Sequence, residues 1–181
     1  MREVASFLRG HAEADITLVM VEADPEVRAA MLSARHAEPG LAPDPRFLVS
    51  EGSASLAALR SGGTPGARVL VNPANQKLNG KGMGVNKEVH AAAGLAALEA
   101  LTRAAHPTVG VPGEAYPVHL PAGNPLREAE GVEVVLHAVG PNMNPDKPSC
   151  LNGDYTLGQA QLGDTYKAVF TSFISLKNAA T

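Results

Sequence analysis

Two asparagines and three glycines stand close together in the middle of the chain, and their types suit the binding of a polar ligand. Asn72 and Asn75 follow an apolar run, and carboxamides can donate and accept hydrogen bonds, as the vicinal hydroxyls of a ribose require. Gly80, Gly82 and Gly84 come next, where the backbone can turn with positive φ and a ligand can approach without meeting a Cβ. An Ala-rich helix is predicted to begin directly behind them, and its free N–H groups would suit a pyrophosphate. The alternative is a capped turn that only redirects the chain.

Two familiar nucleotide motifs do not fit this loop. In the phosphate-binding loop (P-loop) of nucleoside triphosphatases the lysine is followed by Ser or Thr, whereas Lys81 is followed by Gly82. A dinucleotide fingerprint has its first glycine at the end of the strand, whereas the eight residues 72–79 intervene here.

The composition excludes several other classes of site. Of 181 residues, 45% are hydrophobic and 18% charged, which is typical of a globular domain, and residues 1–181 are expected to form one. A single cysteine, Cys150, excludes an internal disulfide and a multi-cysteine zinc site, and no histidine spacing indicates a metal. The net charge of −3 does not predict a surface with direct nucleic-acid affinity. Because the apolar runs are shorter than the ~20 residues of a membrane span and no secretory signal is evident, we expect a soluble intracellular protein, cytoplasmic or nuclear. We also expect it to be a monomer without a cofactor.

Strands and helices alternate along the chain, as expected for a three-layer α/β/α domain with a mixed, largely parallel sheet. Apolar, β-branched runs predict strands at residues 16–21, 46–50, 67–71 and 132–139, with a short strand in residues 115–120. Apolar spacing predicts helices at residues 26–35, 53–60, 86–105 and 155–176, the last with an apolar face of Leu162, Tyr166, Val169, Phe170 and Phe173. Prolines break up residues 107–125, and Arg127, Glu128 and Glu130 are expected in a solvated turn.

Four segments together resemble the signature of the macro domain, an ADP-ribose-binding module: VNPAN at 71–75, the turn from Gly82 to Val85, VHAAAG at 89–94 and VVLHAVGP at 134–141. The resemblance covers residues 46–176, and the segment before the last helix is similar to the macro domain of plant and algal aprataxin-like proteins. It implies the macro-domain fold, with ADP-ribose or an ADP-ribosylated substrate as the partner and no membrane.

The resemblance also implies roles for individual residues. Asn75 would hold the distal ribose, the amides of Gly82 to Val85 and the helix end at Asn86 would cradle the pyrophosphate, and the segment near Ser53 would approach the adenine. Asn75 and Asn86 are the candidate catalytic residues. The full ligand-binding set is Gly52, Ser53, Ala54, Asn72, Asn75, Gly80, Gly82, Met83, Gly84, Val85 and Asn86. His90 and His137 fall on family positions, where we expect packed, hydrogen-bonded rings.

Three departures from the family pattern affect function. Ser53 and Asn86 stand where the family has aspartates, the second of which helps to activate water in the hydrolytic branch. The second phosphate loop of the family is absent from this sequence. The strand–helix unit at 15–36 is of the type that normally closes the domain, which predicts a permuted domain or one lacking the usual C-terminal elements.

Three functions therefore stand beside one another. The first is binding of ADP-ribose or a close derivative, mono-ADP-ribose or ADP-ribose 1″-phosphate. The second is hydrolysis of ADP-ribosyl esters or of a terminal phosphate on the same fold. The Asn86 carboxamide cannot serve as the general base for this reaction. The third is a docking domain that has lost its ligand.

Overall fold

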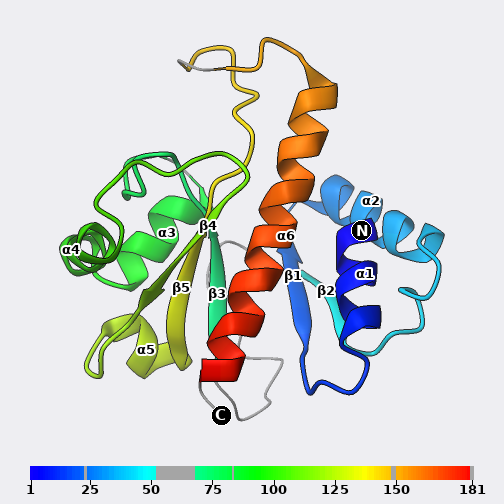
Figure 1. Ribbon diagram of the computed structural model, residues 1–181, viewed down its shortest axis with the longest axis horizontal. Coiled ribbons are helices and arrows are strands. Elements are labelled where there is room, and N and C mark those ends of the chain that lie inside the picture. Colours follow the sequence, from blue (N-terminus) through cyan, green and yellow to red (C-terminus); the bar gives the residue numbers. More distant parts are fainter. Residues whose placement is uncertain (23, 52–67, 83, 148–149, 180–181) are drawn as a thin grey trace. The chain divides into compact units, whose positions relative to one another are not determined.

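The computed structural model describes residues 1–22, 24–51, 68–82, 84–147 and 150–179. The chain divides into two compact units, Met1–Thr64 and Pro65–Thr181 (Figure 1). The helix predicted at 53–60 lies outside the described residues.

The first unit contains a two-stranded parallel sheet with two helices. Its elements in chain order are α1 (Arg2–Gly10), β1 (Leu18–Glu22), α2 (Pro25–Ala37) and β2 (Phe47–Glu51). The strands pair from Leu18 opposite Phe47 to Glu22 opposite Glu51. The sequence predicted both strands and α2. Asp24 caps α2 by accepting hydrogen bonds from the backbone N–H groups of Glu26 and Val27.

Helix α1 was not predicted, although its apolar side is deeply buried. Val4, Phe7 and Leu8 are buried with Ala5. Arg46, just before β2, joins this helix to the sheet by donating to the carbonyl oxygens of Leu8 (3.0 Å) and His11 (2.8 Å). The Asp44 carboxylate pairs with the same guanidinium at 2.8 Å, and this contact lowers the pKa of Asp44.

The second unit is built on a mixed three-stranded sheet in the order β3–β5–β4, in which β5 is parallel to β3 and antiparallel to β4. Its elements are β3 (Arg68–Pro73), α3 (Val85–Ala92), α4 (Leu95–Ala105), β4 (Ala115–His119), α5 (Pro125–Glu130), β5 (Val132–Ala138) and α6 (Tyr155–Ala179). The predicted α/β class with a mixed, parallel-containing sheet is confirmed.

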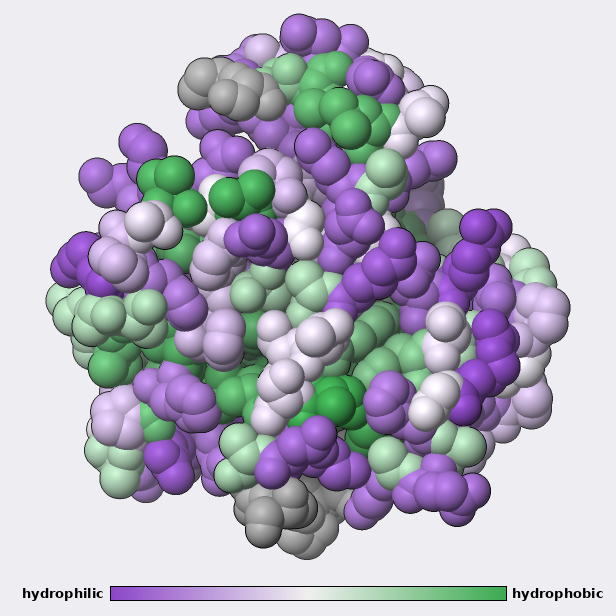
Figure 2. All heavy atoms as spheres, in the orientation of Figure 1, coloured by the Kyte–Doolittle hydropathy of each residue, from purple (hydrophilic) through white to green (hydrophobic). Residues whose placement is uncertain are grey.

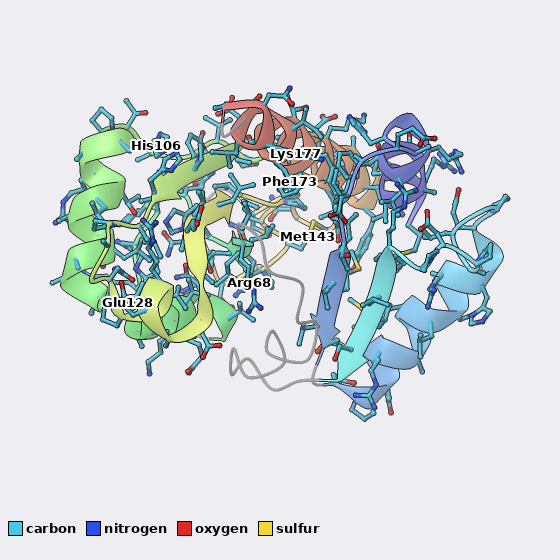
Figure 3. The ribbon with its side chains drawn as sticks, turned by 90° about the horizontal axis from the view of Figure 1, so that it is seen from below. Arg68, His106, Glu128, Met143, Phe173 and Lys177 are labelled. Carbon is cyan, nitrogen blue, oxygen red and sulfur yellow. The ribbon has the colours of Figure 1, made fainter. Side chains whose placement is uncertain are left out.

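Helices cover both faces of β5, because alternate side chains of this central strand meet different helices. Leu136 and Ala138 form a buried cluster with Val169 of α6. On the opposite face, His137 meets Thr102 of α4 and His90 of α3. The second unit is therefore three-layered, with α6 on one side of the sheet and α3 and α4 on the other (Figure 3).

The single helix predicted over residues 86–105 is wrong, because two helices occupy that span. Helix α3 ends at Ala92, and α4 begins at Leu95. Between them Gly94 has φ +80°, a backbone conformation that glycine adopts without strain. The Ala-rich composition on both sides concealed this break.

The solvated turn predicted near Glu128 is also wrong, because Pro125–Glu130 form helix α5. The side chain of Asn124 accepts a hydrogen bond from the Leu126 N–H at 3.0 Å, and Pro125 occupies the first turn, where its missing N–H costs nothing. Leu126 is buried against the core.

Helix α6 closes the unit with only part of its predicted apolar face buried. Val169 is buried, whereas Leu162 is 45% exposed. Figure 2 shows hydrophobic side chains where residues 140–154 meet the first turns of α6. A Cβ placed on Gly158 there would lie 2.9 Å from Met143 Sδ, so the helix and the loop are closely packed at this glycine. No helix among the described residues is long and apolar enough to cross a membrane.

Candidate functional site

The candidate site begins where β3 ends, at a fully buried asparagine. Asn72 lies opposite His137 in the β3–β5 register and is 0% exposed. Its Nδ2 donates to Asn86 Oδ1 at 2.9 Å and lies 2.9 Å from His137 Nδ1. The sheet thereby positions the first asparagine of the predicted pair against two partners that are distant in the sequence.

The orientation of these carboxamides follows from one backbone carbonyl. The Asn79 carbonyl can only accept, so the Asn86 atom 2.8 Å from it must be the nitrogen. The side-chain oxygen of Asn86 therefore faces Asn72, and Asn72 must donate to it from its amide nitrogen. That amide donates to His137 Nδ1, which must be an unprotonated acceptor.

Asn75, the second asparagine of the pair, uses its amide nitrogen to organise the loop. Its Nδ2 donates to the carbonyl oxygens of Asn79 (2.8 Å) and Lys81 (2.9 Å), and lies 3.2 Å from Asn79 Oδ1. All three partners are oxygens, so the assignment of the Asn75 nitrogen is secure. Asn75 and Asn86 thus converge on Asn79, a residue that the sequence did not single out.

In both asparagines of the pair the side-chain nitrogen donates to other protein groups, and the side-chain oxygen is left as an acceptor. Among the described residues, neither Asn72 Oδ1 nor Asn75 Oδ1 has a hydrogen-bond partner, and both atoms are buried. A buried polar atom without a partner is rare and costs about 1–3 kcal/mol, which binding of a donor would recover. The pair therefore suits a ligand with hydroxyl donors, not one with only oxygen acceptors.

The glycines that follow perform different tasks. Gly82 has φ +148° and Gly84 has φ +68°. Gly84 is the residue before the first turn of α3, and a Cβ there would meet no described atom within 4 Å. Gly80 instead allows close packing, because a Cβ on it would lie 2.4 Å from Leu95 Cδ1. Its N–H donates to the Glu99 carboxylate at 3.1 Å.

The start of α3 has the arrangement expected of an anion site. Two of the predicted ligand-binding residues, Val85 and Asn86, form its first turn, so their N–H groups lie at the positive end of the helix dipole. The carbonyl oxygen of Gly84 accepts from the N–H groups of Lys87 (3.1 Å) and Glu88 (3.3 Å). The first turn is therefore well formed behind the open space at Gly84.

Asn86 is held within the protein. The residue is 6% exposed, with its side-chain oxygen bonded to Asn72 and its side-chain nitrogen bonded to the Asn79 carbonyl. Both ends of the carboxamide are thus occupied, and the residue supports the loop.

Two buried histidines lie under the loop. The rings of His90 and His137 stack with centroids 5.5 Å apart. Burial, with the nearby His90 and His106, lowers the pKa of His137 to about 4, and burial also lowers the pKa of His90. The expectation of a packed, hydrogen-bonded ring is correct for His137. His90 is packed, but neither of its ring nitrogens has a hydrogen-bond partner among the described residues.

Part of the predicted ligand-binding set cannot be placed. Gly52, Ser53, Ala54 and Met83 lie outside the described residues. The structure joins Asn75 and Asn86 to Asn79, and Asn72 to Asn86. It places Gly82, Gly84 and Val85 at the adjoining turn. No group of three or more metal-ligating side chains occurs in the described part of the chain.

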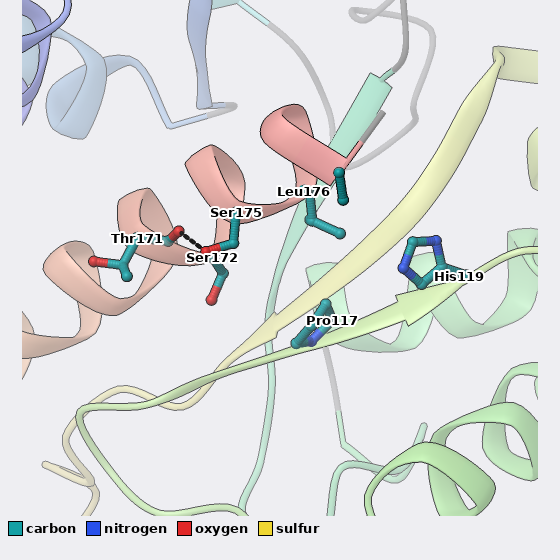
Figure 4. Close-up of a pocket in the computed structure, with 7 residues that line it drawn as sticks. Pro117, His119, Thr171, Ser172, Ser175 and Leu176 are labelled. Atoms are coloured by element: carbon teal, nitrogen blue, oxygen red, sulfur yellow. Dashed lines mark hydrogen bonds between the residues drawn. The ribbon is translucent and has the colours of Figure 1, made fainter. Parts of the chain in front are cut away.

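A separate groove lies between β4 and the C-terminal turns of α6 (Figure 4). It has a volume of about 370 Å³ and is lined by Pro117, His119, Thr171, Ser172, Ser175, Leu176 and Ala179. Ser175 Oγ donates to the Thr171 carbonyl within its own helix at 3.0 Å. None of the predicted site residues that the structure describes lines this groove.

Comparison with known proteins places this chain in a family. No family model matches the chain. The chain is 42% identical over 121 residues to the Arabidopsis thaliana protein "Transcription factor bHLH140", a match that covers 67% of the chain and 13% of the length of that relative. The chain therefore spans only about 13% of that relative.

Two solved structures match nearly the whole chain. The Oryza sativa APL macrodomain in complex with ADP-ribose is 31% identical with a TM-score of 0.75, covering 96% of this chain and 83% of that one. An ADP-ribose binding macrodomain of Dictyostelium discoideum has a TM-score of 0.74 at 22% identity, with 93% and 77% of the two chains covered, and supports the fold alone. Since the match to the rice structure joins sequence identity to a shared fold along almost the entire chain, this chain belongs to the macrodomain family.

Proposed function

We propose that the chain binds ADP-ribose or a close derivative, such as mono-ADP-ribose on a modified substrate or ADP-ribose 1″-phosphate. The single observation that carries this proposal is the pair of buried carboxamide oxygens on Asn72 and Asn75 without partners among the described residues. The rice macrodomain, which is similar over 96% of the chain, is described in complex with ADP-ribose and supports the choice of ligand.

Hydroxyl groups of the distal ribose fit these two oxygens in kind. A vicinal diol has two O–H donors, and each could satisfy one buried acceptor. A phosphate has no equivalent donors when ionised, so it would leave both oxygens unsatisfied. The Asn75 side chain, whose nitrogen is anchored on the loop carbonyls of Asn79 and Lys81, is the first candidate for this contact.

The pyrophosphate would lie at the start of α3. Backbone N–H groups there can bind an anion without a basic side chain, in keeping with the net charge of −3. Gly84 leaves the approach open, since nothing described lies within 4 Å of its Cβ position. The adenine would approach the segment 52–54, as the resemblance implies.

Binding is favoured over hydrolysis by the state of Asn86. A general base must accept a proton near neutral pH, and a carboxamide cannot. Both ends of the Asn86 side chain are also occupied by Asn72 and Asn79. We accordingly propose that the chain binds ADP-ribose and releases ADP-ribosyl esters slowly or not at all. It would act as an intracellular monomer, cytoplasmic or nuclear, without direct nucleic-acid affinity.

Calorimetric titration with ADP-ribose and with ADP tests this function. ADP has the adenosine and both phosphates but lacks the distal ribose, so it cannot satisfy the two carboxamide oxygens. We expect saturable binding of ADP-ribose at one site, at least about tenfold tighter than binding of ADP. No detectable binding of ADP-ribose by the folded chain would refute the proposal, and equal affinities would refute the role of the asparagine pair.

A further inference from the structure

A chain of hydrogen bonds connects the end of β3 to the centre of the second unit. It begins at the Asn79 carbonyl and passes through the Asn86 and Asn72 carboxamides to His137 Nδ1. From there His137 Nε2 lies 3.2 Å from Thr102 Oγ1, which donates to the Leu98 carbonyl at 2.7 Å. Each end is a backbone carbonyl, which can only accept.

These two fixed ends allow only one pattern of donors through the chain. From the first end, Asn72 must donate to His137 Nδ1, so that atom carries no proton. From the second end, the Thr102 hydroxyl proton is committed to Leu98, so its oxygen accepts from His137 Nε2–H. The two deductions are independent, and both require a neutral His137 with its proton on Nε2.

We propose that His137 is a positioning residue for the ligand: as the Nε2–H tautomer it holds the Asn72 carboxamide so that oxygen, and not nitrogen, is offered to the bound ribose. This role rests on the proposed function for its ligand. His137 belongs to β5 and does not itself need to touch the ligand. Its effect is on specificity, because turning the Asn72 carboxamide by 180° would replace the acceptor by a donor.

The alternative arrangement is disfavoured on the protein side. A proton on His137 Nδ1 would face the amide protons of Asn72, and the amide would have to turn away. Its oxygen would then face Asn86 Oδ1, whose own orientation the Asn79 carbonyl fixes. One misplaced proton on His137 would therefore disturb the loop as far as Asn79.

The surroundings of His137 keep the ring neutral at physiological pH. On its face of the sheet lie His90 of α3, His106 after α4, and Tyr116 of β4, which is its partner in the strand register. Two carboxylates on these elements are bonded to other groups: Glu99 accepts from the Gly80 N–H, and Glu114 accepts from the Tyr116 hydroxyl. Burial of the ring, with His90 and His106 nearby and no carboxylate paired to it among the described residues, lowers the pKa of His137 to about 4. Affinity for ADP-ribose should consequently fall as the pH approaches about 4.

Three variants separate positioning from packing. In His137→Asn the side-chain oxygen can take the place of Nδ1 as the acceptor for Asn72, and it does not titrate. His137→Leu retains an apolar side chain but removes the acceptor. Thr102→Val removes the acceptor for Nε2–H without changing the histidine, and it serves if His137→Leu does not fold. Thermal unfolding of each variant shows which proteins are folded.

The experiment combines nitrogen NMR of the free protein with titration of ADP-ribose between pH 7.5 and pH 3.5, a range that spans the pKa of about 4 for His137. We expect the Nε2–H signature for His137, affinity within about threefold of the original for His137→Asn, and a loss of about tenfold or more for His137→Leu and Thr102→Val. The fall in affinity at acid pH should disappear in His137→Asn.

An Nδ1–H tautomer in the free protein, or equal affinity losses for the folded asparagine and leucine variants, would overturn the positioning role. If the original protein binds no ADP-ribose, the proposed function fails, and the positioning role fails with it for want of a ligand. The tautomer would then still show whether the hydrogen-bond chain exists, so the two failures are distinguishable.

Discussion

Replacing Asn75 by alanine should weaken ADP-ribose binding without unfolding the chain. The substitution removes the buried Oδ1 that we assign to the distal ribose. It also removes the amide that donates to the carbonyl oxygens of Asn79 and Lys81. Both losses fall on the loop between β3 and α3.

The magnitude follows from counting the bonds lost on each side. The ribose hydroxyl loses one neutral acceptor in a buried setting, which costs about 1–3 kcal/mol, or roughly 5- to 150-fold in Kd. In the free protein, two loop carbonyls lose a donor but can turn to water, because Asn75 is only half-buried. About 1–2 kcal/mol of stability should therefore be lost, which a folded domain of this size tolerates.

Calorimetry with ADP-ribose measures the first effect, and thermal unfolding measures the second. Asn144→Ala is the matched control, since it removes an exposed asparagine whose Oδ1 accepts from the Asp146 N–H at 2.9 Å in the loop before α6. The control should keep the original Kd. A folded Asn75→Ala protein with unchanged Kd would show that the ribose contact is wrongly assigned.

Other substitutions probe the rest of the account. Gly84→Glu should abolish ADP-ribose binding in calorimetry, since it adds a negative charge beside the pyrophosphate position and a side chain at φ +68°; retained affinity would make the loop a simple turn. Ester-linked mono-ADP-ribose should be released slowly or not at all, and Asn86→Asp should create or raise this release. The same variant should be less stable, because its carboxylate would face the Asn79 carbonyl; rapid release by the original chain would favour the hydrolase function over binding alone. Because the pKa of His137 falls from 6.5 to about 4 on folding, the neutral ring should contribute about 3 kcal/mol to the free energy of unfolding above pH 6.5. This contribution should be lost as the pH falls toward 4. Denaturant titrations of His137→Asn should show no pH dependence from this site. Deleting residues 1–36 removes the strand that pairs with β2 and should unfold the domain; a folded deletion protein by circular dichroism that binds ADP-ribose would show the segment to be an appendage.

The elements that could be predicted were those with a strong local pattern. Continuous apolar runs identified β1, β3 and β5, because a strand covered on both faces has few polar residues. Helix α1 was missed because its apolar residues lie in a short, charged segment near Met1. The break at Gly94 was missed because glycine also occurs inside helices, and only its φ of +80° distinguishes the two cases.

The residue types of the site could be predicted from the sequence, but the hydrogen bonds between them could not. The loop motif identified Asn72, Asn75 and Asn86 as polar residues that act together. It could not show that Asn72 and His137, which are 65 residues apart, share a hydrogen bond, because the register of β3 on β5 creates that contact. Neither could it show which carboxamide atoms remain unpartnered, since that depends on the carbonyls of the folded loop.

A crystal structure of the chain with ADP-ribose tests the central claim most directly. We predict that hydroxyl groups of the distal ribose lie about 2.6–3.0 Å from Asn75 Oδ1 and Asn72 Oδ1, with the pyrophosphate at the first turn of α3. A complex in which ADP-ribose binds elsewhere, or in which both oxygens stay without a ribose donor, would contradict the account.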